Sequence, residues 1–111
     1  MNKYAQVAVN AGFYVKEGMT PDYAWKKASC EIFEPGSSLQ KKGCPKNTFL
    51  GLYGGQGINA EYARKALNYL RSNNISEIEP EELWIIINEG TKKAYNQQMH
   101  VVIAMNKAGL I

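Results

Sequence analysis

Apolar residues recur along this chain with the spacing of helices rather than of strands. In the first segment the stripe consists of Tyr4, Val7, Ala8, Ala11 and Val15, three or four positions apart. A stripe with this spacing lies on one face of a helix with 3.6 residues per turn. The pattern therefore predicts a first helix that ends near Glu17-Gly18.

The next segment carries the features of a helix start and a helix stop. Thr20 can cap the helix, Pro21 suits its first position, and Asp22 places an acid in the first turn. The run Glu34-Pro35-Gly36 stops it. The predicted buried stripe of this second helix is Trp25, Ala28, Ser29 and Ile32, with Phe33 beside it.

The middle of the chain is the least regular part. Residues 36–45 are rich in Gly, Ser and Lys, which predicts a loop in which Ser38 caps a single turn over Leu39 to Lys42. Pro45 can start a short helix that runs to about Tyr53. A strand over Thr48 to Tyr53 is the alternative, and Gly51 weakens both interpretations.

Three further helices are expected in the second half. Asn59 is a good cap for a helix that reaches about Ser72, and Pro80 opens another that includes Leu83, continues to about Asn88 and is ended by Gly90. The last helix is indicated by Tyr95, Met99, Val102 and Ile103, with Gly109 just beyond its end.

These elements predict an all-α fold, a compact single domain over residues 1–111 with five to six short helices. The chain has 111 residues, of which 45% are hydrophobic and 21% charged, as expected for a folded domain with one core. No internal repeat is visible in the sequence.

Composition also indicates the compartment. The longest apolar run, Leu83 to Ile87, is far shorter than the roughly 20 residues of a membrane span, and the N-terminal segment lacks the apolar region of a signal peptide. We therefore expect a cytoplasmic protein without membrane contact. Cys30 and Cys44 are expected as free thiols there, with a single disulfide as the alternative.

The segment Gly55 to Ala60 matches the G-x-G-x-x-A pattern of dinucleotide-binding proteins. In that fold the pattern follows one strand of a parallel sheet and opens a helix that faces a pyrophosphate. Here no second strand follows, and the chain is too short for both halves of such a fold. We therefore expect the glycines to turn the chain between two helices, and we expect no cofactor.

Charge is distributed unevenly although the net charge is only +3. Residues 37–74 contain six basic residues and one acid, whereas residues 75–91 contain five acids and no base. The basic segment indicates contact with nucleic acid, since lysines at a short helix start can meet phosphates. A solvated surface is the alternative. The candidate residues for nucleic-acid or partner binding are Lys41, Lys42, Lys46 and Asn47, with Arg64 and Lys65 as phosphate contacts.

Catalytic patterns are scarce. Cys44 lies at a predicted helix start among lysines, which would favour a reactive thiolate. A catalytic cysteine needs a general base, and the single histidine, His100, belongs to a different predicted helix. An unreactive thiol is the commoner outcome. Because no metal-binding spacing or hydrolase motif occurs either, we predict a non-enzymatic protein with no catalytic residues and no metal.

A protein-interaction role is the alternative function. The five apolar residues from Leu83 to Ile87 cover more of a helix than one core contact requires. Part of this run would then face a protein partner or a second copy in a homodimer.

Three stretches resemble a family of small uncharacterised bacterial proteins that form a domain of unknown function. They are AWKKASCEIF at 24–33, SSLQKKGCPKNTFLGL at 37–52 and NQQMHVVIAMNKAGLI at 96–111, and the KKGCPKxxFLGL part is the most specific. Between Gly54 and Asn59 the chain is shorter than the family pattern. The resemblance implies a shared fold and a site near Lys41 to Leu52, and it transfers no activity.

Overall fold

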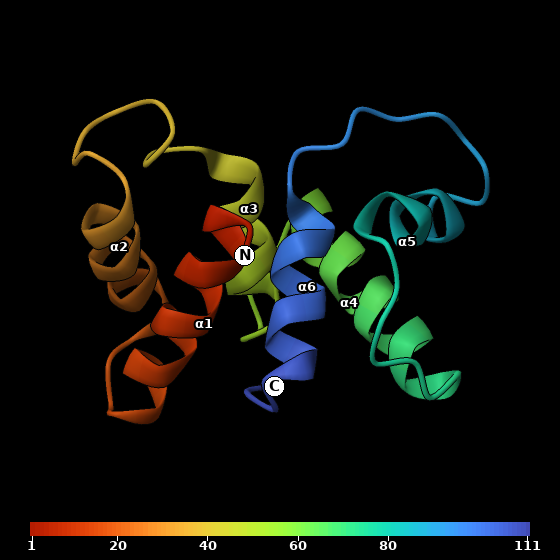
Figure 1. The fold of residues 1–111 in the computed structure, drawn as a ribbon, viewed down its shortest axis with the longest axis horizontal. Coiled ribbons are helices and arrows are strands. Elements are labelled where there is room, and N and C mark those ends of the chain that lie inside the picture. Colours follow the sequence, from red (N-terminus) through yellow and green to blue (C-terminus); the bar gives the residue numbers. More distant parts are fainter.

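The computed structural model describes residues 1–111 and contains six α-helices and no strand, which confirms the all-α class (Figure 1). The helices are α1 Lys3–Lys16, α2 Pro21–Ile32, α3 Gly43–Gly51, α4 Ile58–Ser72, α5 Pro80–Ile87 and α6 Gln98–Lys107. None of them combines the length and the apolarity that crossing a bilayer requires.

The first two helices begin where polar side chains satisfy their free amide groups. Asn2 caps α1 by accepting hydrogen bonds from the N–H groups of Tyr4, at 2.8 Å, and Ala5, at 3.1 Å. Thr20 caps α2 through a longer bond of 3.4 Å from the N–H of Tyr23. Side-chain caps of this kind stabilise a helix by about 1 kcal/mol.

The middle of the chain differs from expectation in its details. Residues 43–51 form helix α3, so the strand alternative for Thr48 to Tyr53 is wrong. The helix begins at Gly43, two residues before Pro45, and ends at Gly51. The turn before it is closed by Ser37 rather than Ser38, because the Ser37 Oγ accepts from the N–H of Gln40 at 3.2 Å.

Helix α4 begins one residue before Asn59, which is therefore not its cap. The cap is Gly57, whose φ of 107° belongs to a backbone region that other residues rarely adopt. Asn59 lies in the first turn, where its Oδ1 accepts a hydrogen bond of 3.2 Å from Gln98 Nε2. The glycines do turn the chain between two helices, as expected.

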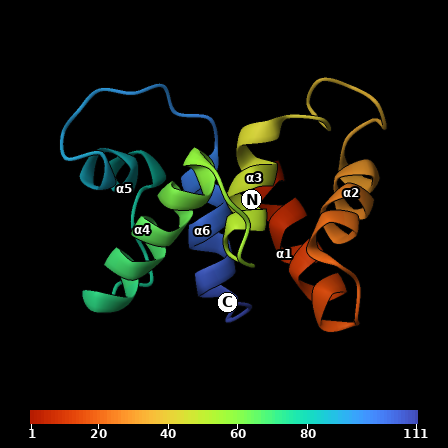
Figure 2. The ribbon, with the colours of Figure 1, turned by 180° about the vertical axis from the view of Figure 1, so that it is seen from behind.

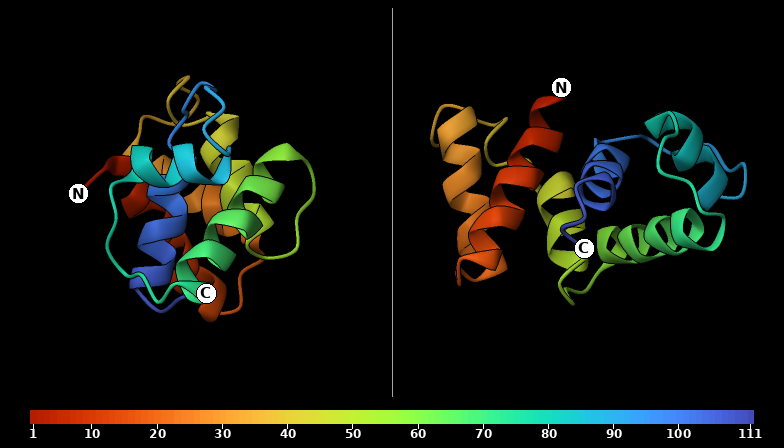
Figure 3. Two further views of the ribbon diagram at one scale, coloured as in Figure 1. Left: turned by 90° about the vertical axis from the view of Figure 1, so that its right-hand side faces the viewer. Right: turned by 60° about the horizontal axis from the view of Figure 1, so that its bottom comes forward.

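The core has two hydrophobic clusters, and α6 contributes to both. The first cluster joins α1, α2 and Phe49 of α3 to Val101, Met105 and the C-terminal Leu110. The second joins α4 and α5 to Met99 and Val102. Because successive positions of α6 face opposite clusters, this helix connects the two sides of the molecule, and it lies at the centre of the view in Figure 3, right.

The two halves of the chain have the same order of elements and a related arrangement. Seen from behind, the molecule resembles its front view, with α4 and α5 in the places of α1 and α2 (Figures 1 and 2). Each half is completed by the other, because α1 packs on α6 and α4 packs on α3. The arrangement is an approximate two-fold repeat of three helices.

Matching hydrogen bonds and residues support the repeat. The first helix of each half ends in a bond to the carbonyl five residues earlier, from Met19 to Tyr14 at 3.1 Å and from Ile75 to Leu70 at 2.9 Å. The third helices end in the same way, at Gly55 and Leu110. The second helices start with a proline and carry a tryptophan four residues later: Pro21 and Trp25 in α2, Pro80 and Trp84 in α5. The sequence prediction missed this repeat.

Candidate anion-binding site

A hollow of about 380 Å³ lies where α2 meets the loop before α3. We call it the lysine hollow. Its lining consists of one acid, one amide, one indole and three amines: Asp22, Trp25, Lys26, Gln40, Lys41 and Lys46. The three lysines outnumber the single carboxylate, which leaves the hollow with a net charge of +2.

The lining residues of α2 share one helix face. Asp22, Trp25 and Lys26 are three and four positions apart, and side chains with that spacing lie next to one another on a helix. Trp25 is buried at the base of this face, whereas Asp22 and Lys26 are exposed above it. The helical spacing that buries Trp25 therefore places the opposite charges of Asp22 and Lys26 at the edge of the hollow.

The loop between α2 and α3 is held in place by Gln40. Its Oε1 accepts a hydrogen bond of 3.1 Å from the N–H of Gly36, and its Nε2 donates one of 2.9 Å to the buried Ser29 Oγ. These bonds tie the loop to α2 next to Lys41. Lys41 is held beside the hollow by these bonds of its neighbour and by a hydrogen bond of 3.1 Å from its own N–H to the carbonyl of Ser37.

The start of α3 concentrates positive charge. Its first turn contains no acid, as is also true of α1 and α6 but not of α2, α4 and α5, and the preceding Lys42 forms no side-chain cap. The N-terminal end of a helix is itself partly positive, so lysines there are electrostatically unfavourable without an anion. The only compensation found is the ion pair of 3.3 Å from Lys46 Nζ to Asp22 Oδ1.

The indole nitrogen of Trp25 has no hydrogen-bond partner. Trp25 is only 1% exposed, and its Nε1 is the one buried side-chain nitrogen or oxygen in the protein that lacks a partner. Leaving a buried donor unpaired costs about 1–3 kcal/mol. The lining of the lysine hollow thus includes a residue whose buried donor has no partner.

The corresponding tryptophan of the second half is satisfied. Trp84 Nε1 donates a hydrogen bond of 2.9 Å to the carbonyl oxygen of Lys93, in the loop before α6. The loops before α3 and α6 both have ten residues. In the first loop the carbonyl of Leu39, one position beyond the counterpart of Lys93, instead accepts from the Tyr4 hydroxyl at 2.8 Å. No loop carbonyl accepts a hydrogen bond from Trp25 Nε1.

In the second half an aromatic side chain also covers the tryptophan. The ring of Tyr95 packs 5.6 Å from that of Trp84, and its hydroxyl binds His100 Nδ1 and accepts from the N–H of His100 at 3.0 Å. Burial lowers the pKa of His100 and raises the pKa of Tyr95 above its ordinary value. A neutral His100 that accepts from the Tyr95 hydroxyl fits both directions.

The predicted residues before and in α3 fall partly in the lysine hollow. Lys41 and Lys46 line it, Lys42 precedes the first residue of α3, and Asn47 is exposed on that helix. Lys26 is a lining residue that the sequence prediction missed, because it lies outside the basic segment 37–74. Lys26 could have been found from the sequence because it directly follows Trp25, on the predicted helix that precedes the basic segment.

The two predicted residues of α4 have other surroundings. Arg64 Nη1 donates a hydrogen bond of 2.9 Å to the carbonyl of Gly55. Lys65 lines a different hollow, of about 270 Å³, together with Lys93, Glu61 and Glu89. The six predicted residues therefore do not share one pocket.

Cys44 is half-buried and free, as is Cys30, so the disulfide alternative is wrong. No hydrogen bond joins Cys44 to His100, whose Nδ1 binds Tyr95. No three side chains of the His, Cys, Asp or Glu types lie close enough together to hold a metal ion. Cys44 is also not among the residues that line the lysine hollow.

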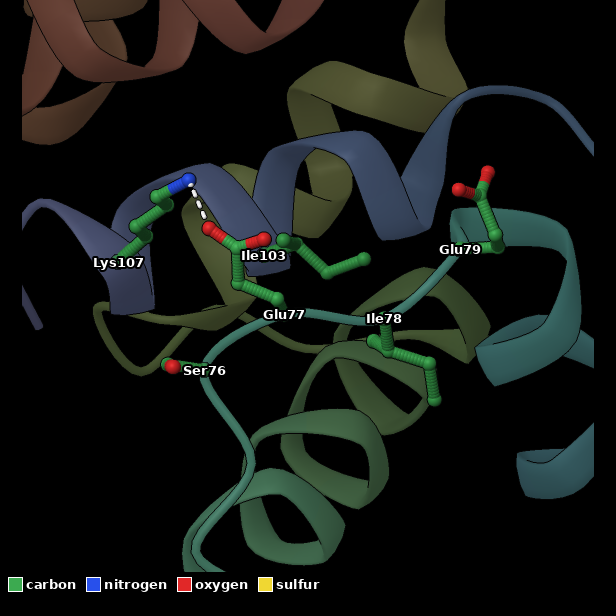
Figure 4. A pocket seen from close by; sticks show the side chains of 6 residues that line it. All are labelled: Ser76, Glu77, Ile78, Glu79, Ile103 and Lys107. Atoms are coloured by element: carbon green, nitrogen blue, oxygen red, sulfur yellow. Dashed lines mark hydrogen bonds and ion pairs between the residues drawn. The ribbon is translucent and has the colours of Figure 1, made fainter.

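The acidic segment forms a separate surface groove (Figure 4). Its lining includes Glu77, Glu79 and Lys107, and the Glu77 carboxylate lies 2.6 Å from Lys107 Nζ. That hydrogen bond lowers the pKa of Glu77. Both of these charged groups are exposed, and no buried side-chain donor in this groove lacks a partner.

Comparison with known proteins places the chain among uncharacterised relatives. The model of a family of unknown function (DUF6979) matches residues 1–57 and again residues 53–111. The two matches meet at the turn between α3 and α4. No curated protein and no solved structure matches the chain.

Proposed function

We infer that this chain, which belongs to the DUF6979 family of unknown function, is a non-enzymatic binding module that contacts nucleic acid through phosphate groups held at the lysine hollow. The observation that carries the proposal is the convergence of Lys26, Lys41 and Lys46 around a tryptophan whose N–H has no partner.

Electrostatics support an anionic ligand. The hollow has a net charge of +2 with Asp22 included, and the adjacent start of α3 adds the positive end of a helix that has no acid in its own first turn. Lysines near a helix start are typical contacts for nucleic-acid phosphates, which bind by charge and not by sequence. The remaining basic residues of the segment, Arg64 and Lys65, would add weaker contacts at a distance from the hollow.

A mobility-shift assay with single-stranded and duplex DNA and RNA, repeated over a range of salt concentrations, tests this function. Affinity should fall as salt rises, because each lysine that contacts a phosphate releases a bound counterion. Changing Lys26, Lys41 or Lys46 singly to Gln should weaken binding to all sequences alike. Each change should reduce the slope of log affinity against log salt by about one.

Lys16→Gln is the matched control. Lys16 is an exposed lysine at the end of α1 that does not line the hollow, and it forms no ion pair. It should leave the affinity and the salt slope unchanged. Absence of any salt-dependent affinity in the wild-type protein would overturn the proposed function, and equal losses with Lys16→Gln would overturn the assignment to the hollow.

Assembly with a protein partner or a second copy is the second candidate. One observation favours it: Ile85, in the predicted apolar run, is 57% exposed although Leu83, Trp84 and Ile87 are buried. A large apolar side chain in water is a common feature of protein interfaces. Light scattering of the wild-type protein and of Ile85→Gln tests it, and a monomer at every concentration would remove the homodimer version.

A further inference from the structure

The loop between α5 and α6, residues 88–97, is attached to the helices mainly through side chains. We call it the Tyr95 loop, and Figure 1 shows it as the long arc that leads into α6. No backbone–backbone hydrogen bond involves its last six residues, 92–97. The last six residues of the loop before α3, 37–42, donate three such bonds. The position of the Tyr95 loop therefore depends on a few side-chain contacts.

Two aromatic side chains hold this loop against the helices. The Lys93 carbonyl accepts a hydrogen bond of 2.9 Å from Trp84 Nε1, and the Tyr95 ring packs with its centre 5.6 Å from that of the Trp84 ring. The Tyr95 hydroxyl accepts from the N–H of His100 at 3.0 Å and also binds His100 Nδ1. The loop is thus attached to α5 through Trp84 and to α6 through His100.

The last residue of the loop is strained. Gln97 has a φ of 73°, in the left-handed region, which costs a residue other than glycine roughly 1–3 kcal/mol. Such a conformation persists only where the surrounding contacts hold it. One of these contacts is a hydrogen bond of 2.8 Å from Asn2 Nδ2 to Gln97 Oε1. Loss of the neighbouring Tyr95 contact would let the backbone at Gln97 relax, so the strain favours release of the loop.

His100 is the group among these contacts that changes its charge near neutral pH. In the neutral form Nδ1 accepts the proton of the Tyr95 hydroxyl. In the protonated form Nδ1 carries its own proton, so the hydroxyl loses this acceptor. The new charge would also lie in the first turn of α6, which is the partly positive end of a helix and contains no acid. Protonation therefore weakens the attachment of the loop in two ways.

The surroundings of His100 keep it neutral while the loop is closed. Burial lowers the pKa of His100, whereas Glu81 in the first turn of α5 and Glu79 just before that helix oppose the shift. These two carboxylates are the charges that act on His100 from the elements packed against α6. Opening the loop would expose the imidazole to water and raise its pKa toward the ordinary value of about 6.5. By linkage, acid then favours the open loop.

We propose that the Tyr95 loop is a pH-sensitive strap, which is closed while His100 is neutral and is released from α5 and α6 when His100 is protonated. Release uncovers the ring of Trp84, on the helix that also carries the exposed Ile85. Acid thereby enlarges the apolar surface of α5. The strap does not depend on the proposed function of the lysine hollow.

Nuclear magnetic resonance of the full-length protein tests the strap, because the two tryptophans give two indole N–H signals. Trp84→Phe identifies one of them by removing it. Between about pH 7 and pH 5 the Trp84 signal should shift toward that of tryptophan in water, with the same midpoint as the ring protons of His100. The Trp25 signal should not shift, since no residue of the loop accepts a hydrogen bond from it.

Two variants separate the strap from a general effect of acid. His100→Gln retains an acceptor for the Tyr95 hydroxyl but cannot be protonated, so the Trp84 signal should no longer depend on pH. Glu81→Gln removes a charge that raises the pKa of His100, so the midpoint of both signals should move to lower pH. Glu34→Gln is the matched control, because Glu34 is an exposed carboxylate in the other loop, and it should leave the midpoint unchanged.

Each contrary outcome overturns the strap. A Trp84 signal that stays constant while His100 is protonated would show that the loop remains closed. A His100 that stays neutral down to about pH 5 would mean that the switch does not operate in this range. Equal shifts of both indole signals would show that the whole protein loosens, and an unchanged pH dependence in His100→Gln would exclude His100 as its cause.

Discussion

Gly51 of α3 and Ala60 of α4 are in direct backbone contact. A Cβ atom added at Gly51 would lie 2.4 Å from the Ala60 Cα and 2.7 Å from its Cβ, distances that real side chains do not reach. Both residues are buried. The contact lets the two helices approach closely at the turn between the halves of the molecule.

Gly51→Ala should therefore destabilise the protein by about 1–3 kcal/mol, the usual cost of overfilling a packed contact. Urea denaturation measures the change in the free energy of unfolding. Gly43→Ala is the control, because a Cβ there would lie 3.7 Å from the Asn47 side chain, an ordinary contact. It should be neutral or stabilising by up to about 1 kcal/mol, since alanine is favoured over glycine in helices. Equal effects of the two changes would contradict the close approach.

The two tryptophans should differ in what a change to Phe costs. Both changes remove one ring and its packing, but only Trp84→Phe also breaks a hydrogen bond and leaves the Lys93 carbonyl without its donor. Trp84→Phe should therefore cost about 1 kcal/mol more than Trp25→Phe, measured by urea denaturation of the ligand-free protein. The opposite order would mean that the N–H of Trp25 has a partner inside the protein.

The cap of α1 should matter more than the cap of α2. Asn2 accepts two backbone hydrogen bonds and also donates one of 2.8 Å to Gln97 Oε1, whereas Thr20 accepts a single bond of 3.4 Å. Asn2→Ala should cost about 1–2 kcal/mol and Thr20→Ala less than about 1 kcal/mol. Thermal unfolding of the two variants side by side measures the difference. A larger loss for Thr20→Ala would contradict the cap geometry.

Stability should fall on mild acidification because of His100. Burial lowers the pKa of His100 in the folded protein, while Glu79 and Glu81 oppose this shift. A group with a lowered folded pKa binds its proton more readily when the chain is unfolded, so its contribution is full above about pH 6.5 and is lost as the pH falls through the folded pKa. Protonation also turns Nδ1 from an acceptor of the Tyr95 hydroxyl into a donor.

Two measurements check this dependence. His100 is the only histidine, so its ring signals in a proton NMR titration are unambiguous and should give a pKa below 6.5. In His100→Gln the loss of stability between about pH 7 and pH 5 should be smaller than in the wild-type protein. A folded-state pKa at or above 6.5 would refute the expected direction.

The helical fold could be predicted because apolar residues recur at helical spacing, and residues that begin or end helices separate these stretches. Thr20-Pro21 and Pro80 mark helix starts by local chemistry, and the structure begins α2 and α5 there. The prediction that Asn59 caps α4 was wrong for a physical reason. A positive φ at Gly57 allows the helix to begin earlier. The Asn59 side chain instead accepts a hydrogen bond from Gln98, which is distant in sequence.

The candidate site was less predictable. Lys41 and Lys46 of the basic segment line one hollow, but the sequence does not reveal that Lys26 joins them or that Lys65 lines a different hollow. The lack of a hydrogen-bond partner for the N–H of Trp25 is also visible only in the folded arrangement. The repeat was hidden because its halves share geometry and few residue identities.

The position of α6 between the two clusters has a consequence for biosynthesis. The first cluster needs Val101, Met105 and Leu110 before α1 and α2 are fully covered, and the second needs Met99 and Val102. The apolar faces of the N-terminal helices therefore remain partly uncovered until α6 has left the ribosome exit tunnel. Stable folding should set in abruptly at that moment rather than helix by helix, and nascent chains stalled before residue 98 should remain sensitive to protease.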